Sequence, residues 1–195
     1  MDHIELAARS EPLTLVWPAP HSPVSLLRFE RPEEWRAFVG CLGIHPDVPE
    51  IIQRKFARAQ KLYLAGWIDF DFLKAGELAA LVALELAVKD RYGQAFTAKT
   101  RTFANLLRHM VEVDQLGDEN LPVIVRCGGT AVGFLTGAAR PTLAERRNGM
   151  AHGDPFEGLP VGGLLELVRD LINYAYRDFI SSRRTGDQGA SASAC

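Results

Sequence analysis

The stretch of sequence that decides the fold is DFLKAGELAALVALELAVKDRY, residues 71–92. Written as a helix, it carries apolar side chains over most of its circumference, and Gly93 follows as a natural helix end. A helix that is apolar nearly all round has to be enclosed by other parts of the chain. The sequence therefore predicts a long central helix over Asp71–Tyr92.

Helical periodicity recurs on both sides of this stretch. Apolar residues at spacings of three and four predict helices over 49–66, 99–115 and 164–180. A shorter helix is expected to start at Pro32, since proline suits the first turn of a helix. The segment 123–125 is compatible with either a short helix or a strand. Together these patterns predict a mainly α protein.

The N-terminal region has a different character. It contains four prolines that exclude a long helix, namely Pro12, Pro18, Pro20 and Pro23. Leu13–Trp17 and Val24–Phe29 are compatible with two short strands, a β-hairpin, or with an extended arm packed on the helices. The small polar residues of 184–195 predict a disordered tail. We therefore divide the chain into an N-terminal extension (1–48), a helical bundle (49–183) and this tail.

Composition limits the function classes. A net charge of −2 and a pI near 6.2 argue against a strongly basic nucleic-acid-binding surface, although not against a local basic site. The longest apolar run is too short to span a bilayer, so no membrane contact is expected. Three cysteines without paired spacing, and Asp2 and Glu5 where a secretion signal is cationic, predict a cytoplasmic protein with reduced thiols. No metal-ligand or nucleotide-binding spacing occurs, so neither a metal nor a cofactor is expected.

The most chemically suggestive segment is RRNGMAHG, residues 146–153. Thr142 and Glu145 have the spacing of a capping box, which predicts that this segment lies on a short helix ending at Gly153. Arginine binds phosphate with a planar fork of donors, and histidine transfers protons near neutral pH. This combination can cleave RNA without a metal. On a helix, neighbouring residues point about 100° apart, so the two arginines are not expected to serve one site equally.

The segment resembles the Arg-x(4–6)-His motif of the HEPN superfamily, small helical proteins that include many toxin and defence ribonucleases. Arg147 and His152 match the motif with four residues between them, and Asn148 follows the arginine as it often does in that family. The apolar run over 79–88 resembles the long core helix of such proteins. The resemblance covers roughly residues 50–183.

The resemblance implies an HEPN-like up-and-down helical bundle and a metal-independent endoribonuclease of the toxin or defence type. It further implies a homodimer in which two His152 side chains share one cleft, with RNA as the substrate. An antitoxin or another protein partner would also fit this class. The alternative is a catalytically inactive HEPN-like module that dimerises or holds a partner protein, which the acidic pI favours.

The candidate catalytic residues are Arg147, His152 and Asn148. His152 would act as general acid or base, Arg147 would stabilise charge on the phosphorus, and Asn148, one turn before His152, would orient the imidazole or bind substrate. Glu85 and Arg146 are supporting candidates. Glu85 lies within the apolar helix and is expected to pair with Arg147 or Lys89, or to point out between helices. Arg146 would contact a flanking phosphate or solvent.

Each of these residues also has a purely structural interpretation. His152 would then be a helix-end residue whose cationic form suits the helix dipole. Arg147 would be a solvated surface cation or the partner of an acid such as Asp170. Asn148 would be an ordinary helix-terminal residue. The sequence leaves both interpretations open.

Overall fold

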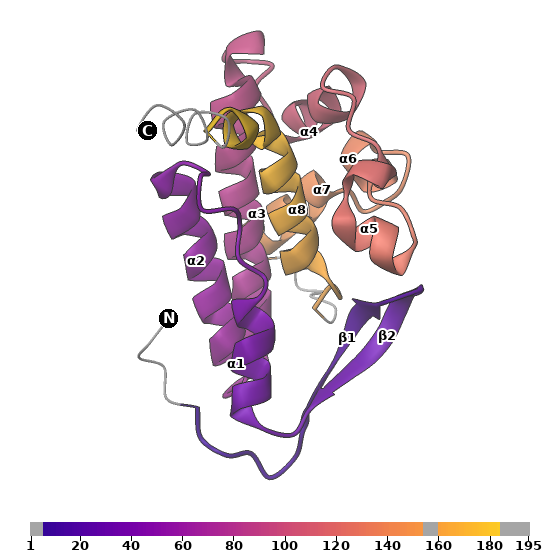
Figure 1. The fold of residues 1–195 in the computed structure, drawn as a ribbon. Helices are drawn as coiled ribbons and strands as arrows, with labels where there is room; N and C mark the ends of the chain where they lie inside the picture. The colour runs from indigo at the N-terminus through magenta and orange to yellow at the C-terminus, as the bar shows by residue number, and fades with distance from the viewer. Residues whose placement is uncertain (1–5, 154–159, 184–195) are drawn as a thin grey trace, which may run out of the picture.

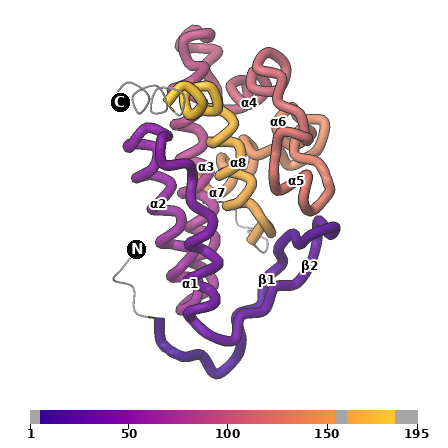
Figure 2. The backbone as a smooth tube through the Cα atoms, viewed as in Figure 1, coloured from indigo at the N-terminus to yellow at the C-terminus, as the bar shows by residue number. Residues whose placement is uncertain are grey.

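The protein is a helical bundle with a two-stranded hairpin near its N-terminus (Figures 1 and 2). A computed structural model describes residues 6–153 and 160–183. In chain order the elements are β1 (Leu13–Ala19), β2 (Ser22–Phe29), α1 (Pro32–Gly40), α2 (Glu50–Ala65), α3 (Asp71–Tyr92), α4 (Phe103–Glu112), α5 (Pro122–Cys127), α6 (Val132–Thr136), α7 (Leu143–His152) and α8 (Leu164–Ala175).

Helix α3 is the centre of the bundle, as predicted. It packs against α2, α4, α7 and α8, and in Figure 1 it runs between α2 and α8. Gly76 lets α3 pack tightly on α2, since a Cβ at this position would lie only 2.6 Å from a ring carbon of Tyr63. The predicted bounds of α3 are confirmed at both ends. Its central place follows because a helix that is apolar over most of its circumference has to be enclosed by other parts of the chain.

The N-terminal strands form a hairpin, which resolves the choice left open by the sequence. β1 and β2 pair antiparallel, with Leu13 opposite Phe29. Leu15 and Trp17 face inward, and the pairing shifts between Trp17 and Ala19, where proline has no N–H to donate. Trp17 belongs to the same hydrophobic core as the residues of α3. The boundary proposed at residue 48 stays a prediction.

Two helices are shorter than expected, and the segment 123–125, for which the sequence allowed a helix or a strand, is helical. α4 covers 103–112 because the Thr102 side chain caps it, accepting from Asn105 N at 3.2 Å, and because Gln115 has a φ of 59°. α8 stops at Ala175, and helical residues resume over 177–183. The segment 123–125 lies in α5. The predicted disordered tail, 184–195, lies outside the described residues.

A buried carboxylate joins the hairpin to the bundle. Glu166 in α8 accepts from Trp17 Nε1 at 3.2 Å, from Arg126 Nη2 at 2.8 Å and from Arg169 Nη2 at 3.1 Å. These donors belong to β1, α5 and α8, so one side chain connects three elements.

The described residues contain no candidate for a membrane-spanning helix. None of their helices has both the length and the apolarity needed to cross a bilayer.

Candidate functional site

Local signals define the helix that carries the candidate residues. The Thr142 hydroxyl accepts from Glu145 N at 3.1 Å, and the Glu145 carboxylate accepts from Thr142 N at 2.9 Å. Helix α7 ends at His152, and Gly153 takes a left-handed conformation with a φ of 73°. The predicted capping box and helix end are both confirmed. α7 therefore presents the arginines, the asparagine and the histidine from one rigid element.

Arg147 is held by an acid of the central helix. Its Nη2 lies 2.7 Å from Glu85 Oε2, and the two side chains are 28% and 30% exposed. Of the two partners expected for Glu85, Arg147 is the observed one. Asp170, an alternative partner for Arg147, instead pairs with Arg169 at 2.7 Å.

A second contact extends this pair along α7. Arg147 Nη1 donates to Asn148 Oδ1 at 3.1 Å, while Arg147 Nε is buried without a hydrogen-bond partner among the described residues. Glu85 thus orients the guanidinium, and the guanidinium in turn orients the Asn148 amide. Asn148 is exposed, and its amide N–H groups donate to none of the described residues.

His152 lies one turn beyond Asn148 and is exposed. Within the described part of the chain its imidazole makes no hydrogen bond or ion pair. The structure therefore brings Glu85, Arg147 and Asn148 into contact, while His152 is exposed and unpaired with respect to the described residues. An exposed imidazole of this kind can exchange protons with a substrate or with a second copy of the chain.

A polar pocket of about 300 Å³ adjoins this face between α4 and α7. We call it the Arg108–Arg140 pocket, since both arginines line it; its other polar lining residues are Thr136, Thr142, Glu145 and Asn148. Both arginines are exposed, and Arg140 forms an ion pair with Glu145. Sequence reasoning missed Arg108, because nothing in the outward face of α4 indicates that it meets a helix 40 residues later.

Arg146 lies on a different side of α7. It lines a separate cavity beneath the hairpin, away from the Glu85–Arg147 pair. The prediction that the two arginines diverge is thus confirmed, as helix geometry requires.

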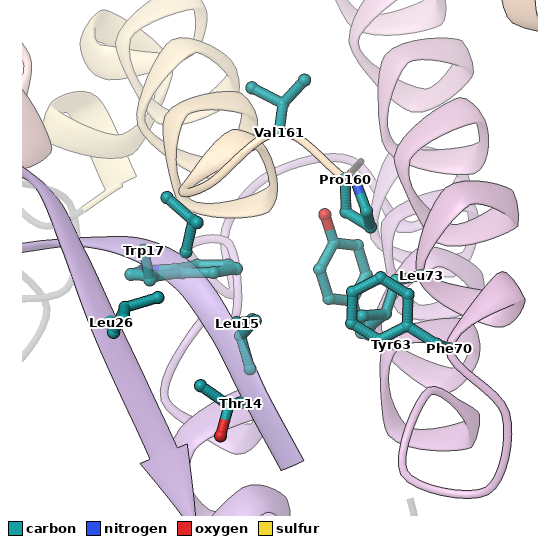
Figure 3. Close-up of a pocket in the computed structure, with 10 residues that line it drawn as sticks. Thr14, Leu15, Trp17, Leu26, Tyr63, Phe70, Leu73, Pro160 and Val161 are labelled. Carbon is teal, nitrogen blue, oxygen red and sulfur yellow. The ribbon is translucent and has the colours of Figure 1, made fainter. Parts of the chain in front are cut away.

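Near Arg146 lies a buried acid that the sequence analysis did not single out. Glu77 in α3 is fully buried; it accepts from the Val161 N–H and lies 3.6 Å from Lys74 Nζ. Burial raises its pKa from 4.5 to about 7, against the opposing effects of Lys74, Val161 N–H and Arg146. The adjacent Tyr63 hydroxyl makes no hydrogen bond of normal geometry with the described residues and points toward Pro160 (Figure 3).

Glu77→Gln should change the pH dependence of stability. A carboxyl group whose pKa is raised on folding stabilises the folded state below pH 4.5, and this contribution is lost as the pH rises through about 7. The variant, which is neutral at every pH, should therefore lose less stability between about pH 5 and pH 8, by on the order of 3 kcal/mol. Urea denaturation at several pH values tests this, with exposed Glu50→Gln as control. Parallel curves for wild type and Glu77→Gln would contradict it.

The described residues offer no metal site. Across residues 6–153 and 160–183, no cluster of three or more His, Cys, Asp or Glu side chains has an arrangement that could hold a metal ion. Cys41 and Cys127 are free thiols, the first exposed and the second buried.

Comparison with known proteins does not assign the chain to a family. The chain matches no family model, no curated protein and no solved structure. The predicted resemblance to HEPN proteins therefore has no support beyond the sequence of residues 79–88 and 146–153.

Proposed function

We propose that the protein is a metal-independent endoribonuclease of the toxin or defence type, with an HEPN-like site on α7. The observation that carries the proposal is the arrangement of this helix. His152 and Asn148 are exposed one turn apart, Arg147 contacts Asn148, and the Arg108–Arg140 pocket lies alongside. Arg108 and Arg140 beside a proton-transferring residue suit a polyanion whose phosphodiester is to be cleaved, with Glu145 offsetting the charge of Arg140.

The proposed reaction is an internal transesterification. The 2′-hydroxyl of RNA loses its proton to a base and attacks the adjacent phosphorus, and the 5′-oxygen leaves after receiving a proton from an acid. The products are a 2′,3′-cyclic phosphate and a 5′-hydroxyl. Arg147 would stabilise the charge that develops on the phosphoryl oxygens.

This reaction needs both an acid and a base, and α7 offers one histidine per chain. A two-fold dimer would bring two His152 side chains to one cleft, since a symmetric interface presents the same residues twice. The exposure of His152 at the end of α7 is compatible with such a contact. We therefore propose a homodimer as the active species.

The proposal is tested with purified protein and single-stranded RNA in the presence of EDTA. Cleavage should occur and leave 2′,3′-cyclic phosphate and 5′-hydroxyl ends. Light scattering of the same sample should give twice the chain mass of 21.5 kDa. Cleavage that requires added metal would contradict the proposed chemistry, and an active monomer would contradict the shared cleft.

Arg147→Lys separates the shape of arginine from its charge. Lysine can keep the ion pair with Glu85 but lacks the planar fork that matches phosphoryl oxygens. If Arg147 stabilises the transition state, kcat should fall on the order of ten-fold or more, while substrate binding weakens less. Arg146→Lys is the matched control and should lose less activity. Equal losses at both positions would show that general attraction of RNA, and not positioned catalysis, explains the arginines.

One observation favours the second candidate, a catalytically inactive module that binds a partner. The Glu85 carboxylate already occupies Nη2 of Arg147, so phosphate would have to share or displace that contact. In this case Arg147 acts as a structural link between α7 and α3. Absence of cleavage together with a stable dimer would support the module.

A further inference from the structure

The cavity that Arg146 lines stands apart from the proposed RNA site. It has a volume of about 430 Å³ and lies between the hairpin, the α5–α6 loop, α7 and the start of α8. We call it the Arg146 pocket. Its apolar lining includes Val24, Ile124, Phe134, Leu143, Val161 and Leu167.

The size and lining of the Arg146 pocket suit a small molecule. Pockets that bind such ligands measure roughly 300–1,000 Å³ and are mostly apolar, with a few polar groups that set orientation. A neighbouring cavity beyond Val161, shown in Figure 3, measures about 210 Å³ and is lined by no charged side chain. The Arg146 pocket thus combines ligand-sized apolar volume with a cation.

Close backbone contacts fix the walls of the pocket. A Cβ at Gly162 would lie 2.7 Å from the Val16 carbonyl oxygen, and one at Gly163 would lie 2.7 Å from Pro18 Cδ. The two glycines therefore let the start of α8 pack directly on β1. A pocket with walls held in this way loses little freedom when a ligand enters.

Arg146 gives the pocket its charge. Its side chain is half-buried and forms no ion pair with any of the described residues. Glu77 is near enough for Arg146 to lower its pKa, yet the two do not reach ion-pair distance. Arg147 differs in this respect, because its charge is neutralised by the ion pair with Glu85. A guanidinium at an apolar wall favours a planar anion that can accept two hydrogen bonds.

We infer that the Arg146 pocket binds a small amphipathic carboxylate, such as a medium-chain fatty acid, with the carboxylate on Arg146 and the alkyl chain against the hairpin and α8. A carboxylate matches the guanidinium fork, and an alkyl chain matches the remaining lining. This inference is independent of the proposed ribonuclease activity, because it concerns the opposite side of α7.

The test uses octanoate and its uncharged analogue 1-octanol, titrated into the full chain in a calorimeter. Arg146→Gln should weaken octanoate binding about ten-fold or more, since the variant loses the charge-assisted hydrogen bonds to the carboxylate. Binding of 1-octanol should change little, which shows that the variant keeps its pocket. Equal octanoate affinity in wild type and Arg146→Gln, or no octanoate binding at millimolar concentration, would overturn the inference.

A matched pair of hairpin variants locates the ligand. Val24 and Leu26 lie on β2 and are 70% and 69% exposed, but Val24 lines the Arg146 pocket and Leu26 lines the smaller cavity. Val24→Glu should weaken octanoate binding by repulsion, and Leu26→Glu should not. Equal effects of the two changes would place the ligand elsewhere. Because no RNA is present, these outcomes do not depend on whether the protein cleaves RNA.

Discussion

His152→Ala should reduce RNA cleavage by about 10²–10⁴-fold, the range expected when a general acid or base is removed. Both catalytic protons would pass through this residue in the proposed dimer, so the variant leaves neither an acid nor a base. The fold should be unaffected, because His152 is exposed at the end of α7 and forms no hydrogen bond or ion pair with the described residues. The measurement is initial-rate cleavage in EDTA, together with the circular-dichroism melt.

A second histidine gives the control for this experiment. His21 is exposed in the hairpin turn and has a φ of 62°, a conformation that asparagine tolerates. His21→Asn should therefore keep both the activity and the melting temperature. If His152→Ala cleaves RNA as fast as His21→Asn, the proposed catalytic role is wrong and the binding-module alternative gains support.

Glu166→Ala should produce the largest loss of stability among the substitutions considered. The change removes the acceptor that Trp17, Arg126 and Arg169 share, and with it the hydrogen bond that joins the hairpin to α8. Breaking a buried ion pair typically costs about 3–5 kcal/mol. We expect about 2–3 kcal/mol, because Arg169 keeps Asp170 and the side chain of Arg126 is 43% exposed and can be hydrated.

Urea denaturation measures this loss, and a surface pair supplies the comparison. Glu50 and Arg54 form an ion pair at 2.6 Å with both side chains 74% exposed. Glu50→Ala should change the unfolding midpoint little, since exposed pairs are solvated in both states. A Glu166→Ala variant as stable as Glu50→Ala would show that the hairpin is held by apolar packing alone.

The mainly helical architecture was predictable because its signals are local. The apolar surface of 71–92 and the Gly93 stop defined α3, and the Thr142–Glu145 capping box defined the start of α7. These features depend on residues within one or two turns of each other. The hairpin was harder to predict, since a proline-rich segment can lie as an extended arm unless a partner strand and a buried face select the pairing.

The candidate site was predictable only in part. The capping box and Gly153 place Arg147, Asn148 and His152 on one helix, and the helical repeat separates Arg146 from Arg147. Their roles in catalysis stay predictions. For Glu85 the sequence left three alternatives open: a pair with Arg147, a pair with Lys89, or a side chain that points out between helices.

The pairing of Glu85 with Arg147 depends on how α3 and α7 cross. The other features to which several elements contribute likewise depend on how those elements pack together. Arg108 reaches the site from α4, Glu166 joins three elements, and the Arg146 pocket has walls from four parts of the chain. These arrangements follow from the packing of whole elements against one core, where the separation along the chain exceeds the few residues that local patterns encode. A sequence pattern specifies which face of a helix is apolar, whereas the neighbour that meets each polar side chain is set by the packing of the complete bundle.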